Sequence, residues 1–105
     1  MTQTERIALM ESYLDESNSA MKNFFDSLER YHKVQGKIHE LSEYYSNGQW
    51  RRDFEDDEAG KIPSNIKRGV LSEDALFDFL TENDNLLEHA EEIIREIRMK
   101  KHELS

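Results

Sequence analysis

The first 46 residues carry an apolar side chain at every third or fourth position, and this spacing constrains the fold more than any other feature. The apolar residues of this series are Ile7, Met10, Leu14, Met21, Phe24, Leu28, Tyr31 and Ile38, with Ser17 and Gln35 in the two remaining slots. A heptad pattern of this length predicts one long helix with an apolar stripe, which we place over residues 4–46. Thr2 and Glu5 have the spacing of a capping box at its start. Asn47-Gly48 supplies a left-handed stop at its end.

Three consecutive polar residues, Ser17-Asn18-Ser19, are the weakest point of this predicted helix. Their side chains compete for backbone hydrogen bonds and favour helix ends. The chain has one Pro and four Gly, none of them at this point, so we expect the helix to continue. A break would instead give a short first helix folded back on the second, in a monomeric three-helix bundle.

A second heptad stripe occupies the last third of the chain. Its apolar residues are Leu76, Leu80, Leu87, Ala90, Ile94 and Ile97, flanked by Phe77, Phe79, Leu86 and Ile93. Ser72 is a suitable N-cap, and Glu73 and Asp74 place negative charge at the positive end of the helix dipole. We therefore predict a second long helix over residues 72–102.

The segment between these helices, residues 47–71, is too long for a structureless loop in a compact domain. Trp50 and Phe54 lie one helical turn apart, which predicts a short helix over residues 49–58, ended by Ala59-Gly60. An irregular return then leads to the last helix. We expect this segment to form a cap with a small aromatic core.

These elements predict an all-α protein with a single domain, residues 1–105, built as a long antiparallel helical hairpin with the cap between its two long helices. The first helix is about 12 residues longer than the second, so it overhangs by roughly 18 Å at 1.5 Å per residue. The overhang carries Ile7, Met10 and Leu14, which have no partner within one hairpin. Two hairpins paired about a twofold axis would cover these residues. We therefore expect a homodimer that forms a four-helix bundle.

Composition and charge argue against several classes of chemistry. The chain has no Cys, which removes disulfides, thiolate metal sites and cysteine nucleophiles. Its formal net charge of −9 disfavours binding to nucleic acid and to anionic membranes. No apolar run approaches the roughly 18 residues of a membrane span, and the N-terminus lacks the features of a signal peptide. We expect a cytoplasmic protein without nucleic-acid or membrane partners.

Acidic residues crowd the predicted cap, at Asp53, Glu55, Asp56, Asp57 and Glu58. An EF-hand loop fails from either possible start, because Glu58 or Ile66 falls where a Gly or a bidentate Glu is required. We interpret the acids as ion-pair partners of the neighbouring bases, which are Arg51, Arg52, Lys61, Lys67 and Arg68. The sequence therefore assigns no metal ligand, no cofactor and no catalytic residue.

Three segments of the chain carry a family resemblance. They are Leu41–Tyr45 (LSEYY), Trp50–Pro63 (WRRDFEDDEAGKIP) and Arg68–Leu76 (RGVLSEDAL). These segments resemble the uncharacterised bacterial family known as domain of unknown function 4298. The resemblance covers about 40 residues closely, as counted over Leu41–Leu80, and the flanking helices only by pattern. It strengthens the domain assignment, implies no assigned activity and transfers no catalytic residue.

The long apolar stripes favour a non-enzymatic protein–protein interaction or assembly module, with an unknown protein partner. The candidate structural and interaction residues are Ile7, Met10, Leu14, Trp50, Phe54, Arg68 and Ser72. One alternative is a metal-dependent hydrolase that acts on nucleotides through carboxylates, although the facing E-x-x-E motifs of such enzymes are lacking. Another is an acidic DNA mimic, although 14 basic residues interrupt its negative field.

Overall fold

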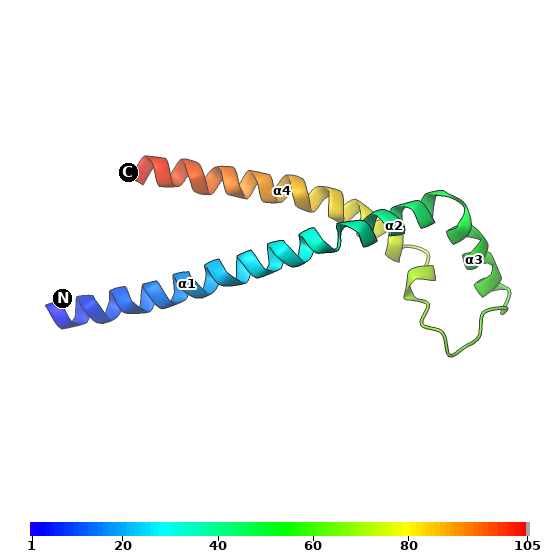
Figure 1. Cartoon of the computed structure of the whole chain (residues 1–105), viewed down its shortest axis with the longest axis horizontal. Helices are drawn as coiled ribbons and strands as arrows, with labels where there is room; N and C mark the ends of the chain where they lie inside the picture. Colours follow the sequence, from blue (N-terminus) through cyan, green and yellow to red (C-terminus); the bar gives the residue numbers. More distant parts are fainter. Residues whose placement is uncertain (105) are drawn as a thin grey trace. The chain divides into compact units, whose positions relative to one another are not determined.

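The computed structural model describes residues 1–104, and this part of the chain is entirely helical apart from turns and irregular segments (Figure 1). Its elements are α1 (Gln3–Lys33), α2 (Gln35–Ser46), α3 (Gln49–Glu58), the 3-10 helix η1 (Gly69–Leu71) and α4 (Ala75–Leu104). The prediction of an all-α fold with two long helices and short helices between them is confirmed.

The start of α1 is fixed by the predicted cap. The Thr2 hydroxyl oxygen accepts a hydrogen bond from the backbone N–H of Glu5 at 3.1 Å, and it donates to the Glu5 carboxylate at 3.1 Å. These bonds satisfy one of the backbone donors that a helix start leaves open. The helix then runs without interruption through Ser17-Asn18-Ser19, so the alternative break at that point is wrong.

The prediction of one continuous helix over residues 4–46 is wrong at Val34, which separates α1 from α2. The backbone of Val34 has φ −88° and ψ 2°, and its N–H still bonds to the Arg30 carbonyl at 3.1 Å. The Gln35 side-chain amide donates to the Tyr31 carbonyl at 2.8 Å. A side-chain hydrogen bond thus satisfies this backbone carbonyl at the interruption. β-Branched Val34 and the nearby Gly36 are both weak helix formers, which explains why the helix yields here.

The chain divides into two compact units, with the boundary between Lys37 and Ile38. The first unit consists of α1 and the first residues of α2, and α1 buries none of its residues. The second unit contains the rest of α2, then α3, η1 and α4. It holds the buried core residues of the described chain, which are Ile38, Trp50, Leu71 and Leu76.

The short helix of the cap forms as predicted. Gly48 lies in the left-handed region at φ 92°, where it ends α2 and leads directly into α3. At the other end the Ala59 N–H bonds to the Glu55 carbonyl at 3.0 Å, and Gly60 follows at φ 74°. Both glycines occupy a conformation that L-residues with a Cβ avoid, so both stops are encoded in the sequence.

The second long helix begins three residues later than predicted, at Ala75, so the assignment of Ser72 as its N-cap is wrong. The backbone N–H of Ser72 instead bonds to the Gly69 carbonyl at 3.1 Å and closes η1. The Asp78 N–H then bonds to the Asp74 carbonyl at 2.8 Å, where α4 starts. The 3-10 helix places Leu71 in the core, where it is 8% exposed. The burial of Leu71 outweighs the preference of Ser72 for an N-cap position.

Candidate functional site

Trp50 organises the aromatic cap at the centre of the second unit. It is 5% exposed and forms a buried cluster with Leu71 and Leu76. Partly buried side chains complete this cluster from α2, α3 and α4; they are Leu41, Tyr44, Tyr45, Phe54 and Leu80. The 3-10 helix η1 contacts both α3 and α4, so the cluster joins all these elements.

The Trp50 indole is held by stacking and by one hydrogen bond. Its ring stacks on Phe54 with centroids 5.1 Å apart and an interplanar angle of 17°, and it meets Tyr45 at 5.1 Å and 53°. The indole Nε1–H donates to the Val70 carbonyl at 2.8 Å. The buried polar atom of the ring is therefore satisfied, which removes the usual cost of burying it. The guanidinium of the exposed Arg51 lies 5.9 Å from the centroid of the Trp50 ring.

A second side-chain bond ties α2 to α3. The Tyr44 hydroxyl donates to the Asp53 carboxylate at 2.6 Å, and the pair is partly buried. Partial burial, the hydrogen bond to Asp53 and the negative charge of Asp53 together raise the pKa of Tyr44 to about 12. Nothing in the sequence singles out this pair, because its two residues lie nine positions apart on different helices.

Two further acids of the cap form ion pairs, as the sequence interpretation proposed. Asp57 lies 3.4 Å from the Arg68 guanidinium, and Asp56 lies 3.9 Å from the Lys61 ammonium. The Arg68 side chain also donates to the Pro63 carbonyl at 3.4 Å, which links the irregular return to α3. These carboxylates hold the cap together rather than converging on a common point. Within residues 1–104 no three His, Asp or Glu side chains are grouped as metal ligands.

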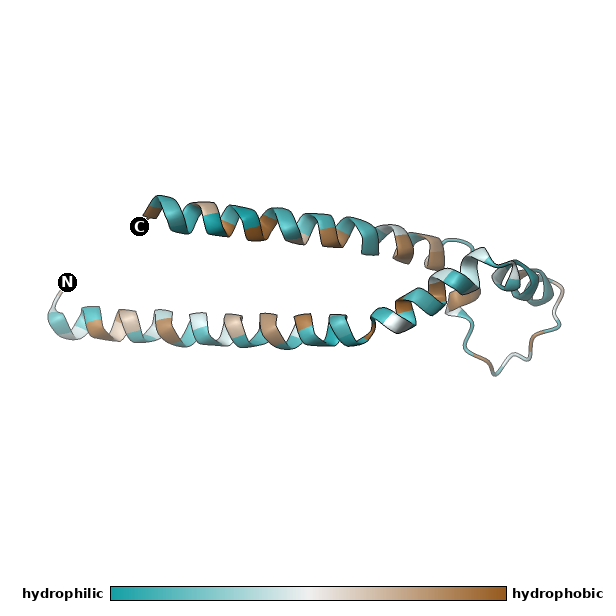
Figure 2. Cartoon of the chain, turned by 45° about the horizontal axis from the view of Figure 1, so that its top comes forward, coloured by the Kyte–Doolittle hydropathy of each residue, from teal (hydrophilic) through white to brown (hydrophobic). Residues whose placement is uncertain are grey.

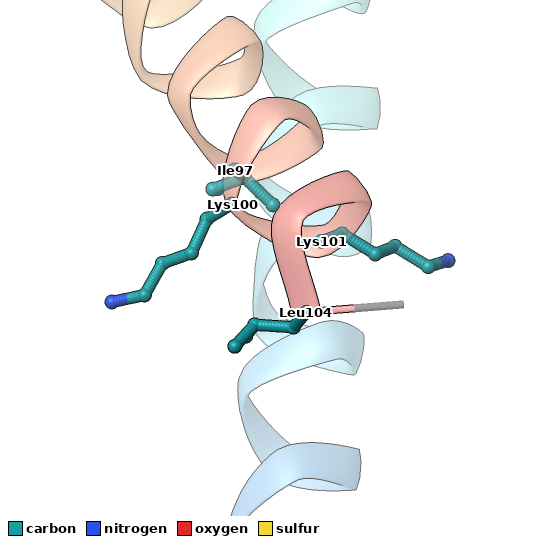
Figure 3. A pocket seen from close by; sticks show the side chains of 4 residues that line it. All are labelled: Ile97, Lys100, Lys101 and Leu104. Atoms are coloured by element: carbon teal, nitrogen blue, oxygen red, sulfur yellow. The ribbon is translucent and has the colours of Figure 1, made fainter.

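One hollow on the described surface has a volume of about 480 Å³ and lies along α4. Ile97, Lys100, Lys101 and Leu104 line it, and all of them belong to this one helix. Figure 3 shows Lys100 and Lys101 extending to opposite sides of the helix, so the two charges do not converge. A hollow of this kind is a helix surface between side chains and offers no constellation for catalysis.

The apolar stripe of α1 and the part of the α4 stripe from Leu87 onward are largely exposed. The candidate residues Ile7, Met10 and Leu14 are 56%, 50% and 54% exposed. Figure 2 shows apolar residues recurring at intervals along both long helices. Monomeric proteins rarely leave large contiguous apolar patches in contact with water, which makes these faces candidate interaction surfaces.

The candidate residues from the sequence thus fall into three places. Ile7, Met10 and Leu14 lie on α1, Trp50 and Phe54 lie in the cap, and Arg68 and Ser72 lie on the segment between α3 and α4. The cap brings Trp50 and Phe54 into direct contact. Sequence reasoning missed the Tyr44–Asp53 bond and the Gln35 side-chain bond at the helix interruption.

No helix within the described residues is both long enough and apolar enough to span a membrane. Comparison with curated proteins and with solved structures finds no match. A family model described as domain of unknown function (DUF4298) matches residues 7–96, which includes most of α1, the whole cap and most of α4. This match confirms the resemblance carried by the LSEYY, WRRDFEDDEAGKIP and RGVLSEDAL segments. The chain belongs to the family described as domain of unknown function (DUF4298).

Proposed function

We propose that this chain is a non-enzymatic protein–protein interaction module that folds as an antiparallel helical hairpin and self-associates as a homodimer. One observation carries the proposal: α1 has a sustained apolar stripe and buries none of its residues. Large side chains of this stripe are half exposed or more, namely Ile7 56%, Met10 50%, Leu14 54%, Met21 66%, Phe24 58% and Leu28 54%. At about 25 cal/mol per Å² of apolar surface, covering this stripe supplies a strong driving force for association.

The apolar stripe of α4 is the natural partner of this surface, because the charges of the two helices are complementary when the helices run antiparallel. Residues 3–16 carry four acids and one base, whereas residues 95–103 carry four bases and two acids. At the other end, residues 22–37 carry four bases and two acids, and residues 78–92 carry six acids and no Lys or Arg. A parallel arrangement would place acids against acids along one half and bases against bases along the other.

Two helices leave part of their apolar surface uncovered, which favours a second copy. The two stripes are widened by residues on their sides, at Phe25, Val34, Phe79 and Ile93. A two-helix hairpin covers one side of each helix, so the widened sides stay in water. Pairing of two hairpins in a four-helix bundle buries them, and closed twofold symmetry is the commonest arrangement of such assemblies.

The acids of the cap support a structural role for this segment. Asp53 accepts the Tyr44 hydroxyl, Asp56 pairs with Lys61 and Asp57 pairs with Arg68. Three of the five clustered carboxylates are thus engaged in holding α3 to its neighbours. No observation favours the alternative of a carboxylate-dependent hydrolase acting on nucleotides.

Light scattering coupled to size-exclusion chromatography at micromolar concentration tests the proposal. The chain has a mass of 12.5 kDa, and we expect the native protein to elute with twice that mass. Met10→Glu combined with Leu14→Glu should lower the mass or unfold the chain, because charge enters the apolar stripe of α1. Ser12→Glu combined with Ser19→Glu adds the same charge on the polar side of α1 and should leave the mass unchanged.

Two results would contradict the proposal. One is a native mass near 12.5 kDa over the whole micromolar range, which would indicate a monomer. The other is a Met10→Glu, Leu14→Glu variant with unchanged mass and unchanged helical content by circular dichroism. The serine variants control for the effect of two added charges on a protein that already carries a net charge of −9.

A further inference from the structure

We infer that two copies of the chain pair through one face of α1, with the two α1 helices antiparallel. We call this face the α1 seam; its eight residues are Met10, Tyr13, Ser17, Ala20, Phe24, Ser27, Tyr31 and Val34. The inference rests on the proposed function, because it names the surface and the orientation of self-association. It uses residues of the first unit alone, so it does not depend on where that unit lies relative to the second.

The α1 seam is a continuous and uncharged face of one helix. Its residues are spaced alternately by three and four positions, which is the spacing of a helix face that packs on a second helix. None of them is Asp, Glu, Lys, Arg or His. Met10, Tyr13 and Phe24 are 50%, 51% and 58% exposed. Two chains of net charge −9 repel each other, so a contact face without acids favours their association.

The C-terminal part of the seam carries a hollow shaped for a side chain of a facing helix. Ser27, Arg30, Tyr31 and Val34 line this hollow, which has a volume of about 290 Å³. These residues follow the order i, i+3, i+4 and i+7, which is the four-residue hole that receives one side chain in knobs-into-holes packing. The short side chain of Ser27 leaves the hole open, and three of its four lining residues belong to the seam.

One antiparallel alignment pairs every residue of the seam with a seam residue of the second copy. Met10 then faces Val34, Tyr13 faces Tyr31, Ser17 faces Ser27 and Ala20 faces Phe24. The Tyr13 ring of each copy lies at the level of the hollow of the other copy and provides the knob for it. A shift by one heptad in either direction moves two residues at one end of the seam beyond the seam of the partner. The alignment is therefore specified by the pattern itself.

The charges beside the seam agree with the same alignment. Glu16 and Arg30 hold the same heptad position, 14 residues apart, and both are exposed. The alignment places Glu16 of each copy within two residues of rise, about 3 Å along the axis, of Arg30 of the other copy. Twofold symmetry makes two such ion pairs. A parallel pair of α1 helices would instead place Glu16 against Glu16 and Arg30 against Arg30.

The whole of α1 has the same polarity. Residues 3–16 carry four acids and one base, and residues 22–37 carry four bases and two acids. An antiparallel copy places the acidic half of each α1 against the basic half of the other. A second copy of α1 thus satisfies both the uncharged seam and the charges on either side of it.

Engineered disulfides test the alignment, because the chain contains no Cys. A mixture of Ser17→Cys chains and Ser27→Cys chains should cross-link between copies and migrate at twice 12.5 kDa on a non-reducing gel. Each variant alone is the control and should stay at 12.5 kDa. In the antiparallel pair, two copies of residue 17 are about ten residues of rise apart, roughly 15 Å, which exceeds the roughly 7 Å reach of a disulfide. Both serines are exposed, so the substitutions should preserve the fold.

A charge exchange tests the ion pairs in the native chain without cross-linking. Glu16→Arg and Arg30→Glu should each raise the dimer dissociation constant at least about 10-fold, because each turns two attractive contacts into repulsive ones. An equimolar mixture of the two variants should recover the native mass by light scattering, since the mixed dimer regains both ion pairs. Asp15→Arg is the matched control: it makes the same charge change one residue earlier, on the side of α1 that faces away from the seam. It should leave the dissociation constant within about twofold of the native value.

The outcomes separate this inference from the proposed function. A native chain that stays monomeric over the whole micromolar range overturns both. A native dimer in which Ser17→Cys cross-links with itself, or in which the mixed cysteine variants do not cross-link, overturns the α1 seam alone. The seam is also overturned if the mixed charge variants associate no more tightly than each variant does by itself. Self-association would then use another surface of the chain.

Discussion

Removal of the Trp50 ring should destabilise the cap more than any other single substitution. Trp50 is 5% exposed, stacks on Phe54 and donates its indole N–H to the Val70 carbonyl at 2.8 Å. Trp50→Ala should cost about 3–5 kcal/mol, the range for a large buried aromatic. About 1 kcal/mol of this is the lost hydrogen bond. Trp50→Phe keeps an aromatic ring against Phe54 and should cost only about 1–3 kcal/mol.

The size of these losses relative to the total stability determines how they are measured. A domain of about 100 residues has a free energy of unfolding of roughly 5–15 kcal/mol, so Trp50→Ala removes a large part of it. Urea unfolding followed by circular dichroism gives the free energies, and Trp50→Phe is the quantitative variant because it should stay folded. Trp50 is the only Trp of the chain, so the native fluorescence reports the cap alone, with an emission maximum shifted to the blue.

Phe77→Ala provides the matched aromatic control. Phe77 is 54% exposed and lies next to the buried Leu76, so its loss should cost less than about 1 kcal/mol. The reasoning is refuted if Trp50→Ala costs no more than Phe77→Ala, or if Trp50→Phe is as stable as the native chain. Emission from the folded native protein at the wavelength of a solvated indole would refute it as well.

Two further predictions concern the cap and the helix interruption. The folded pKa of Tyr44 is about 12 against an ordinary value of 10.0, so its neutral form stabilises the fold below pH 10 and this contribution is lost toward pH 12. Tyr44→Phe should therefore cost about 1 kcal/mol in urea unfolding at pH 8, and this cost should fall as the pH rises from 10 toward 12; an equal cost at pH 8 and at pH 11 would contradict this. Gly36→Ala should raise the melting temperature, because Gly36 is helical with open space around a Cβ, and Gly48→Ala at φ 92° should lower it. Shifts of the same sign would contradict the second prediction.

Local signals in the sequence predicted most of the helical elements. The one-turn spacing of Trp50 and Phe54, followed by Ala59-Gly60, predicted α3 with its observed bounds. Two boundaries were wrong because a neighbouring interaction competed with the local signal. At Val34 the helix is interrupted without a Pro, and the hydrogen bond from the Gln35 side chain to the Tyr31 carbonyl stabilises the interruption. At Ser72 the burial of Leu71 favours the 3-10 helix η1 over an earlier start of α4.

The candidate site was predictable where it depends on pattern and not where it depends on tertiary contact. Heptad spacing identified Ile7, Met10 and Leu14 as an apolar surface, since periodicity alone defines a helix face. The partners of individual polar groups could not be predicted. Tyr44 meets Asp53 only because Gly48 turns the chain between their helices.

The absence of any buried residue in α1 has a consequence for how its helical state is maintained. Without tertiary burial, a helix of 31 residues depends on local hydrogen bonds and capping, which leave isolated helices frayed in water. The order of α1 is then thermodynamically linked to whatever covers its stripe, whether this is α4 of the same chain or a second copy. Amide hydrogen exchange should consequently slow in α1 as its stripe becomes covered. Exchange in α1 that slows as concentration rises would report cover by a second copy, whereas slow exchange that is independent of concentration would report cover by α4 of the same chain.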